Sequence, residues 1–164
     1  MKNNSDFYNY LGIRYLYEGN FDEGWKYYEF RKSKLSNFFK DIDEWDGTSI
    51  NDKSIVVYNE QGLGDSIQFS KYLLTLSKVS NKITFVVQEN IKNLFKELKN
   101  INIKTYNECK NQTFDFKISL GSLIKFFYKE IINPEESLIE FNHKNKIELE
   151  NKIDFSKKNI GLVW

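Results

Sequence analysis

A short apolar run, Ile55–Tyr58, leads directly into residues 59–66, a polar segment with two glycines, and then into an amphipathic stretch that reaches Val79. This order predicts a buried strand, a turn and the start of a helix. Glycine lets the backbone bend sharply and lets a ligand approach it closely. The turn after the first strand of an α/β sheet is a common place for a binding site. The segment therefore predicts both a fold class and the position of a site.

From Lys53 onward, strand-like and helix-like segments alternate along the chain. Strands are predicted at 55–58, 83–87, 101–106, 114–120 and 159–164. Helices are predicted at 65–79, 91–98 and 143–153, with a helical turn at 122–128. Such alternation predicts a mostly parallel sheet with helices on both faces. We therefore expect an α/β fold, with a Rossmann-like domain over residues 50–164.

Residues 6–32 have the periodicity of helices. Two stripes of aromatic, apolar and small residues lie on either side of a break at Gly19 and Asn20: Tyr8, Leu11, Gly12 and Tyr15, then Phe21, Gly24, Trp25 and Tyr28. Two helices joined by a tight turn form an antiparallel hairpin, and Gly12 and Gly24 would let them approach closely. We expect this hairpin at 1–36 and a linker at 37–49, in which 43–47 is typical of a turn held by an aromatic side chain.

The order of residues in the hairpin also follows the tetratricopeptide repeat pattern. Two interpretations are open: a single repeat of a helical solenoid, or a plain αα-hairpin packed on the main domain. Both predict the same local structure. A single repeat cannot build a stable solenoid alone, so in either case the hairpin must pack on the following domain or on further repeats.

Charge and composition exclude several function classes. The net charge of the 164 residues is +1, so no global field attracts nucleic acid or an anionic membrane. The one cysteine excludes an internal disulfide. There is neither an apolar run of membrane-spanning length nor the apolar core of a signal peptide, so we expect no transmembrane segment and a cytoplasmic location. An apolar strand that ends on Trp164 leads us to expect a piece of a larger protein.

Six blocks of the sequence together resemble one family. They are residues 19–25, 28–31, 45–47, 60–69, 114–115 with 120–123, and 160–164. In order and spacing they are similar to bacterial tetratricopeptide-repeat proteins that carry a heptosyltransferase-like glycosyltransferase domain. The resemblance implies the last repeat followed by the acceptor-side, Rossmann-like half of a GT-B fold, without the donor-binding half. Two positions depart from the family pattern: Gly24 stands in place of the usual Ala, and Ile124 in place of a common Pro.

Asp65 is the predicted catalytic residue. The resemblance implies that it deprotonates the hydroxyl of the acceptor, and sugar transfer needs a base near the nucleophilic oxygen. A substrate-binding role is predicted for the residues around it: Glu60, Gln61, Gly62, Leu63, Gly64, Ser66 and Gln68. Alternatively, Asp65 and Gln68 form a variant of the capping box, and the other residues shape the turn or hydrogen-bond locally.

The partners follow from the same resemblance. It implies a nucleotide-sugar donor, bound through the missing C-terminal domain, and a hydroxyl-bearing acceptor that is a glycan, a lipid-linked sugar or a protein. The repeat would allow a protein partner, and no nucleic acid is expected. Cys109 has no His or Cys companion at metal-ligand spacing, and His143 is expected at the surface of a charged segment, so we expect no metal and no cofactor. The alternative function is a non-catalytic interaction module, made of a repeat hairpin and a Rossmann-like domain.

Overall fold

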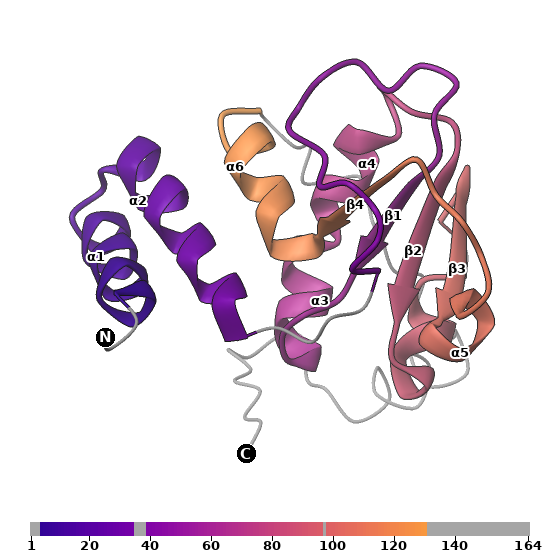
Figure 1. The fold of residues 1–164 in the computed structure, drawn as a ribbon, viewed down its shortest axis with the longest axis horizontal. Helices are drawn as coiled ribbons and strands as arrows, with labels where there is room; N and C mark the ends of the chain where they lie inside the picture. The colour runs from indigo at the N-terminus through magenta and orange to yellow at the C-terminus, as the bar shows by residue number, and fades with distance from the viewer. Residues whose placement is uncertain (1–3, 35–38, 97, 131–164) are drawn as a thin grey trace, which may run out of the picture.

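The computed structural model describes residues 4–34, 39–96 and 98–130. A helical hairpin stands beside a four-stranded sheet with helices packed against it (Figure 1). The predicted helix at 143–153 and the predicted strand at 159–164 lie outside the described residues.

The sheet is entirely parallel, as predicted. Its strands are β1 (Ile55–Tyr58), β2 (Ile83–Val87), β3 (Ile101–Thr105) and β4 (Phe116–Ser119). Their spatial order is β3-β2-β1-β4, a Rossmann-like arrangement in which the chain changes direction between β1 and β4. Every residue of β1 and β2 is buried, which explains their continuous apolar sequences. The crevice at the carboxyl ends of β1 and β4 is the point where α/β sheets usually bind ligands.

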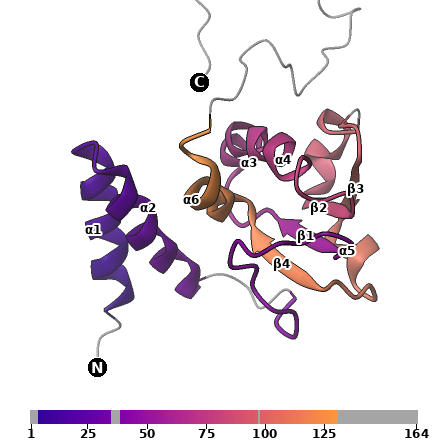
Figure 2. The same cartoon turned by 90° about the horizontal axis from the view of Figure 1, so that it is seen from above.

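One face of the sheet carries most of the core and most of the helices. These are α3 (Leu63–Phe69), α4 (Lys71–Leu76), the 3-10 helices η2 (Glu89–Leu94) and η3 (Leu120–Ser122), and α6 (Leu123–Phe127). On the other face, the described residues place α5 (Tyr106–Cys109) and the side chains of Phe39, Ile42 and Phe114 against a cluster that includes Val56 and Val86. Figure 2 shows α3 and α4 on the opposite side of the sheet from α5. Among the described residues, the second face is therefore covered largely by loops rather than by long helices.

The predicted helix at 65–79 is two shorter helices, α3 and α4, that meet at Ser70. The Ser70 hydroxyl donates to the carbonyl of Ile67 at 2.7 Å, and such back-bonding competes with regular helix geometry. The predicted strand at 101–106 is one residue too long, because Tyr106 begins α5. There the carboxylate of Glu108 accepts the Thr105 N–H at 2.7 Å, which starts a helix.

The hairpin consists of α1 (Ser5–Tyr17) and α2 (Phe21–Tyr28), and the 3-10 helix η1 (Glu29–Lys34) continues from α2. Gly19 adopts a φ of 79° between the helices, and the side chain of Asn20 accepts the N–H of Glu23 as an N-cap. The close approach expected at Gly12 is confirmed. A Cβ there would lie 2.5 Å from the Tyr28 nitrogen and 2.8 Å from the Tyr27 carbonyl carbon.

Substituting Gly12→Ala should lower the free energy of unfolding by about 1–3 kcal/mol, because the added methyl meets backbone atoms that cannot move aside without separating the helices. Urea denaturation measures this change. Gly64→Ala is the matched control: a Cβ at Gly64 meets nothing within 4 Å, and its φ is not positive. Equal losses in the two variants would contradict the close approach of α1 and α2.

The segment expected to be a linker pairs with the sheet. The Lys117 N–H donates to the Asp43 carbonyl at 2.9 Å, and the Trp45 N–H donates to the Lys117 carbonyl at 2.8 Å, so the segment lies along the outer edge of β4. The Trp45 ring is buried and its Nε1 donates to the Thr48 carbonyl at 2.8 Å. The expected aromatic anchor is therefore present, but residues 43–45 pair with β4 instead of forming a turn, and the chain bends only at Gly47.

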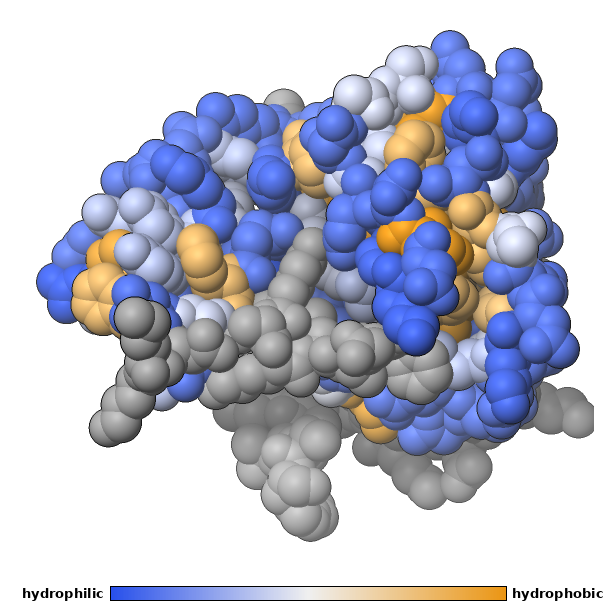
Figure 3. Space-filling view, viewed as in Figure 1, coloured by the Kyte–Doolittle hydropathy of each residue, from blue (hydrophilic) through white to orange (hydrophobic). Residues whose placement is uncertain are grey.

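The outer face of α1 carries large side chains that stay exposed. These are Phe7, Tyr10, Ile13 and Tyr17. Apolar residues of the hairpin are visible at the left of the space-filling view, beside a mostly hydrophilic surface (Figure 3). In the part of the chain that the structure describes, no helix combines the length and the apolar character that crossing a membrane requires.

Candidate functional site

Asp65 lies where it was predicted, at the carboxyl edge of the sheet, in the first turn of α3 after β1. Its Oδ2 accepts the Gly62 N–H at 3.1 Å, and the structure records no other bond to this carboxylate from the described residues. The side chain is partly exposed. The site thus has an acid that is oriented by one amide and still open to a ligand.

Asp65 also caps its helix, although not in the way predicted. Gly62 is the N-cap residue and Asp65 is the third helical residue, which reaches back to the N-cap amide. Gln68 is exposed on α3 and takes no part in this contact. Because capping uses one carboxylate oxygen, the second oxygen is left for chemistry, so the two roles are compatible.

The glycines of the turn do not supply an unusual backbone conformation. Gly62 has φ −68° and ψ 171°, and among the described glycines only Gly19 and Gly47 have positive φ. Gly62 and Gly64 therefore lie in the turn without using a backbone conformation that is reserved for glycine. Gly64 instead leaves open space, since a Cβ there would meet no described atom within 4 Å. A ligand could approach the backbone closely at this position.

Ser66 is buried, and its hydroxyl donates to the Gly62 carbonyl at 3.0 Å. This corrects the predicted substrate role: Ser66 closes the turn from inside the helix. Leu63 and Gln68 lie on the exposed surface of α3, so their contact with substrate stays a prediction.

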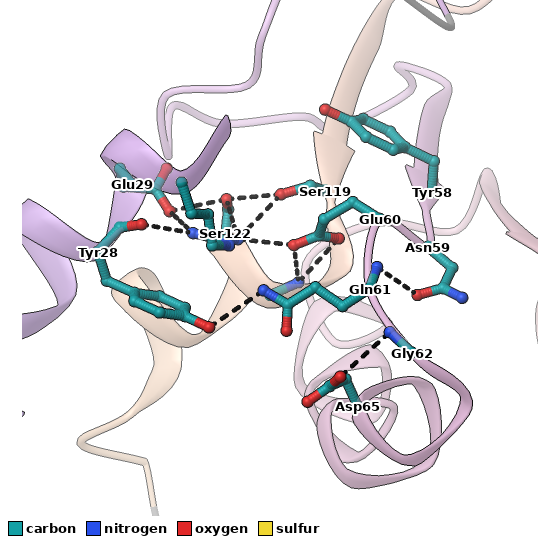
Figure 4. Close-up of polar contacts among 12 residues, drawn as sticks. Tyr28, Glu29, Tyr58, Asn59, Glu60, Gln61, Gly62, Asp65, Ser119 and Ser122 are labelled. Carbon is teal, nitrogen blue, oxygen red and sulfur yellow. Dashed lines mark hydrogen bonds and ion pairs between the residues drawn. The ribbon is translucent and has the colours of Figure 1, made fainter. Parts of the chain in front are cut away.

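Glu60 is not available to an acceptor hydroxyl, contrary to prediction, because it lies in a buried ion pair. Its side chain is 2% exposed, and its Oε1 is 2.7 Å from Nη2 of Arg31, which is 7% exposed. The same carboxylate oxygen accepts the Gly121 N–H at 3.2 Å. Figure 4 shows Glu60 near Ser119 and Ser122, on the side of the turn that faces Tyr28 and Glu29 of the hairpin. Glu60 therefore joins three parts of the chain rather than facing solvent.

Arg31 has further partners around the pair. Its Nη1 is 2.9 Å from Glu29 Oε1, and its Nη2 donates to the hydroxyls of Ser122 at 3.1 Å and Ser119 at 3.3 Å. Burial by itself would lower the pKa of Arg31, but the carboxylates of Glu60 and Glu29 more than offset it, so the pKa is raised. The guanidinium is thus fixed in its charged form inside the protein.

Gln61 is held at both ends. Its Nε2 donates to the Tyr28 hydroxyl at 3.1 Å, and its backbone N–H donates to Asn59 Oδ1 at 3.2 Å. Asn59 is buried at the end of β1, and its Nδ2 has no partner among the described residues. Gln61 thus orders the turn, and its predicted contact with substrate stays a prediction.

The sequence did not point to roles for the residues that surround Glu60 and Gln61. These are Tyr28, Arg31, Asn59, Ser119 and Ser122. Three of them, Tyr28, Arg31 and Ser122, lie in blocks 28–31 and 120–123, which carry the family resemblance. Membership of these blocks is the one feature of the sequence that could have indicated a role. Helical periodicity could not pair Arg31 with Glu60, because the two are 29 residues apart in different elements.

A hollow of about 880 Å³ lies on the second face of the sheet and contains none of the predicted site residues. Aromatic side chains line it, including Phe39, Tyr106 and Phe114. Burial, followed by the charge of Glu60, raises the pKa of Tyr106 to about 12. Burial also raises the pKa of the Cys109 thiol, which makes it a weak nucleophile. Lys40, Asp41 and Lys110 line the same hollow, so it combines an aromatic surface with charged groups.

Asp41 and Asp43 form an Asp-x-Asp pair that the expectation of no metal did not take into account. Within the described ranges, no group of three or more His, Cys, Asp or Glu side chains could hold a metal ion. The pair on its own does not make a metal site.

Comparison with known proteins adds no relative. No family model matches the chain, and no match was found among the curated proteins or the solved structures.

Proposed function

We propose that the chain is the acceptor-side portion of a glycosyltransferase, which transfers a sugar from a nucleotide-sugar donor to a hydroxyl. One observation carries this proposal. A partly exposed carboxylate, Asp65, stands at the switch point of a parallel sheet with one oxygen oriented by the Gly62 amide. The sequence resemblance to heptosyltransferase-like enzymes supports it independently.

In the proposed reaction, the free oxygen of Asp65 takes the proton of the acceptor hydroxyl. The acceptor oxygen forms a bond to the anomeric carbon of the sugar, and the bond from that carbon to the nucleoside diphosphate breaks. In the complete protein, exclusion of water by a donor-bearing domain would bring the acceptor hydroxyl and this carboxylate into direct contact.

Asp65→Asn tests the role of the base. In the complete protein with its donor domain, we expect the variant to lose about 10²- to 10⁴-fold in kcat, because general-base catalysis contributes about this factor. The amide can still accept the Gly62 N–H, so the fold should be retained. Transfer of a radiolabelled sugar from the nucleotide donor measures the loss.

Asp52→Asn is the matched control. It makes the same chemical change at the opposite edge of the sheet, before β1, where a positive φ of 63° suits asparagine as well as aspartate. Transfer should be unchanged in this variant. Near-normal transfer by Asp65→Asn would overturn the proposed base.

A second candidate function is a non-catalytic interaction module, and the exposed outer face of α1 favours it. The aromatic rings of Phe7, Tyr10 and Tyr17 form a surface of the kind that contacts other proteins. Calorimetry of the complete protein with nucleotide-sugars separates the two. Binding supports the transferase, and the absence of any binding supports the module.

A further inference from the structure

The end of the hairpin holds two consecutive residues of the turn that leads to Asp65. Arg31 contacts Glu60 at 2.7 Å, and the Tyr28 hydroxyl accepts from Gln61 at 3.1 Å. Figure 4 shows the contact between Tyr28 and Gln61. The Arg31 guanidinium also stacks over the Tyr28 ring, 4.6 Å from its centroid, so the two hairpin residues behave as one unit.

The contact chain continues from Gln61 to the acid. Gly62 follows Gln61 directly, and its N–H is the one recorded hydrogen-bond donor to Asp65 from the described residues. On the sheet side, Asn59 fixes the backbone N–H of Gln61, and Ser66 fixes the carbonyl of Gly62. The orientation of the Asp65 carboxylate therefore depends on where the hairpin places Gln61.

The geometry around the ion pair leaves little room for another arrangement. A Cβ at Gly121 would lie 2.7 Å from Glu60 Oε1 and 2.8 Å from Arg31 Nη2, so the pair fills the space that a side chain would need. Gly121 lies in η3, which follows β4, on the other side of the switch point from Glu60. Arg31 thus contacts both the segment after β1 and the end of β4.

We propose that the hairpin is part of the candidate site, with Tyr28 and Arg31 as positioning residues that act on Asp65 through Gln61 and Glu60. The catalytic consequence rests on the proposed function, while the structural coupling does not. In this arrangement the helical hairpin does more than connect the sheet to a partner. It sets the geometry of the turn at the carboxyl edge.

Tyr28→Phe tests the coupling with minimal disturbance, because it removes the hydroxyl and keeps the ring that stacks on Arg31. Amide hydrogen exchange of the 164-residue chain reports on the turn. We expect the N–H groups of Gln61, Gly62 and Ser66 to exchange about fivefold faster, the effect of losing one ordinary hydrogen bond. The Asn59 N–H, which pairs with Val86 in the sheet, should keep its rate.

Tyr27→Phe is the matched control, since Tyr27 packs on Tyr8, Tyr15 and Phe30 within the hairpin. It should leave the turn unchanged. A second test removes the other side of the same hydrogen bond. Gln61→Met should speed up amide exchange as much as Tyr28→Phe does, and the double variant should exchange no faster than either single variant. Unchanged exchange at Gly62 and Ser66 in Tyr28→Phe, or full additivity of the two substitutions, would overturn the coupling.

Transfer by the complete protein separates this inference from the function on which its catalytic part rests. If the hairpin positions Asp65 and the protein is a transferase, Tyr28→Phe lowers kcat about fivefold at an unchanged KM for the acceptor. Tyr27→Phe leaves kcat unchanged. If Asp65→Asn retains transfer while the exchange rates change as expected, the proposed function fails and the coupling stands. If Asp65→Asn abolishes transfer and the exchange rates do not change, the function stands and the positioning role fails.

Discussion

Replacing Arg31 by methionine should lower the free energy of unfolding by about 3–5 kcal/mol, because it leaves the Glu60 carboxylate buried without its counter-charge. Glu60 is 2% exposed, so water cannot take the place of the guanidinium. Urea denaturation at pH 7 measures the loss.

Two comparisons isolate the buried pair. Arg14→Met breaks an ion pair with Glu18 that is exposed on both sides, so it should cost no more than about 1 kcal/mol. The double variant Arg31→Met/Glu60→Met should lose much less than Arg31→Met and Glu60→Met combined, because no unpaired charge remains. A loss below about 1 kcal/mol in Arg31→Met would show that the pair does not form as described.

Phe85→Ala should cost about 3–5 kcal/mol of stability, the range for removing a fully buried ring. Phe85 is in the middle of β2, is 0% exposed, and packs edge-to-face on Phe95 with ring centroids 5.3 Å apart. Thermal unfolding followed by circular dichroism measures the change. Phe7→Ala removes the same ring from a site that is 64% exposed and should change stability by no more than about 0.5 kcal/mol. Similar losses in both variants would contradict the assigned core.

The strands β1 and β2 were predicted with their observed bounds, because continuous β-branched and apolar runs leave little choice for a buried parallel strand. β4 was predicted too long, since Asp115 at its start bonds to Ser54 instead of joining the strand ladder. The break at Ser70 was missed because a serine hydroxyl can bond either to solvent or to its own helix, and composition does not decide between them.

The position of Asp65 could be predicted from the sequence because it depends only on a local order: strand, turn, helix. The neighbours of Glu60 could not, because they come from the hairpin and from the turn after β4. Gly121 belongs to the sequence block 120–123. The need for a glycine there is steric, and it becomes evident only when Glu60 and Arg31 are both in place. Gly24 is similar, since a Cβ there would lie 2.5 Å from the Leu16 side chain.

The pairing of Asp43 and Trp45 with Lys117 has a consequence for self-association. A strand from another molecule can extend a sheet only by bonding to free amides and carbonyls along its rim. At Lys117 both groups are already taken. An incoming strand would first have to displace this short segment together with the buried indole of Trp45. The segment before the sheet thus protects the β4 side against edge-to-edge polymerisation.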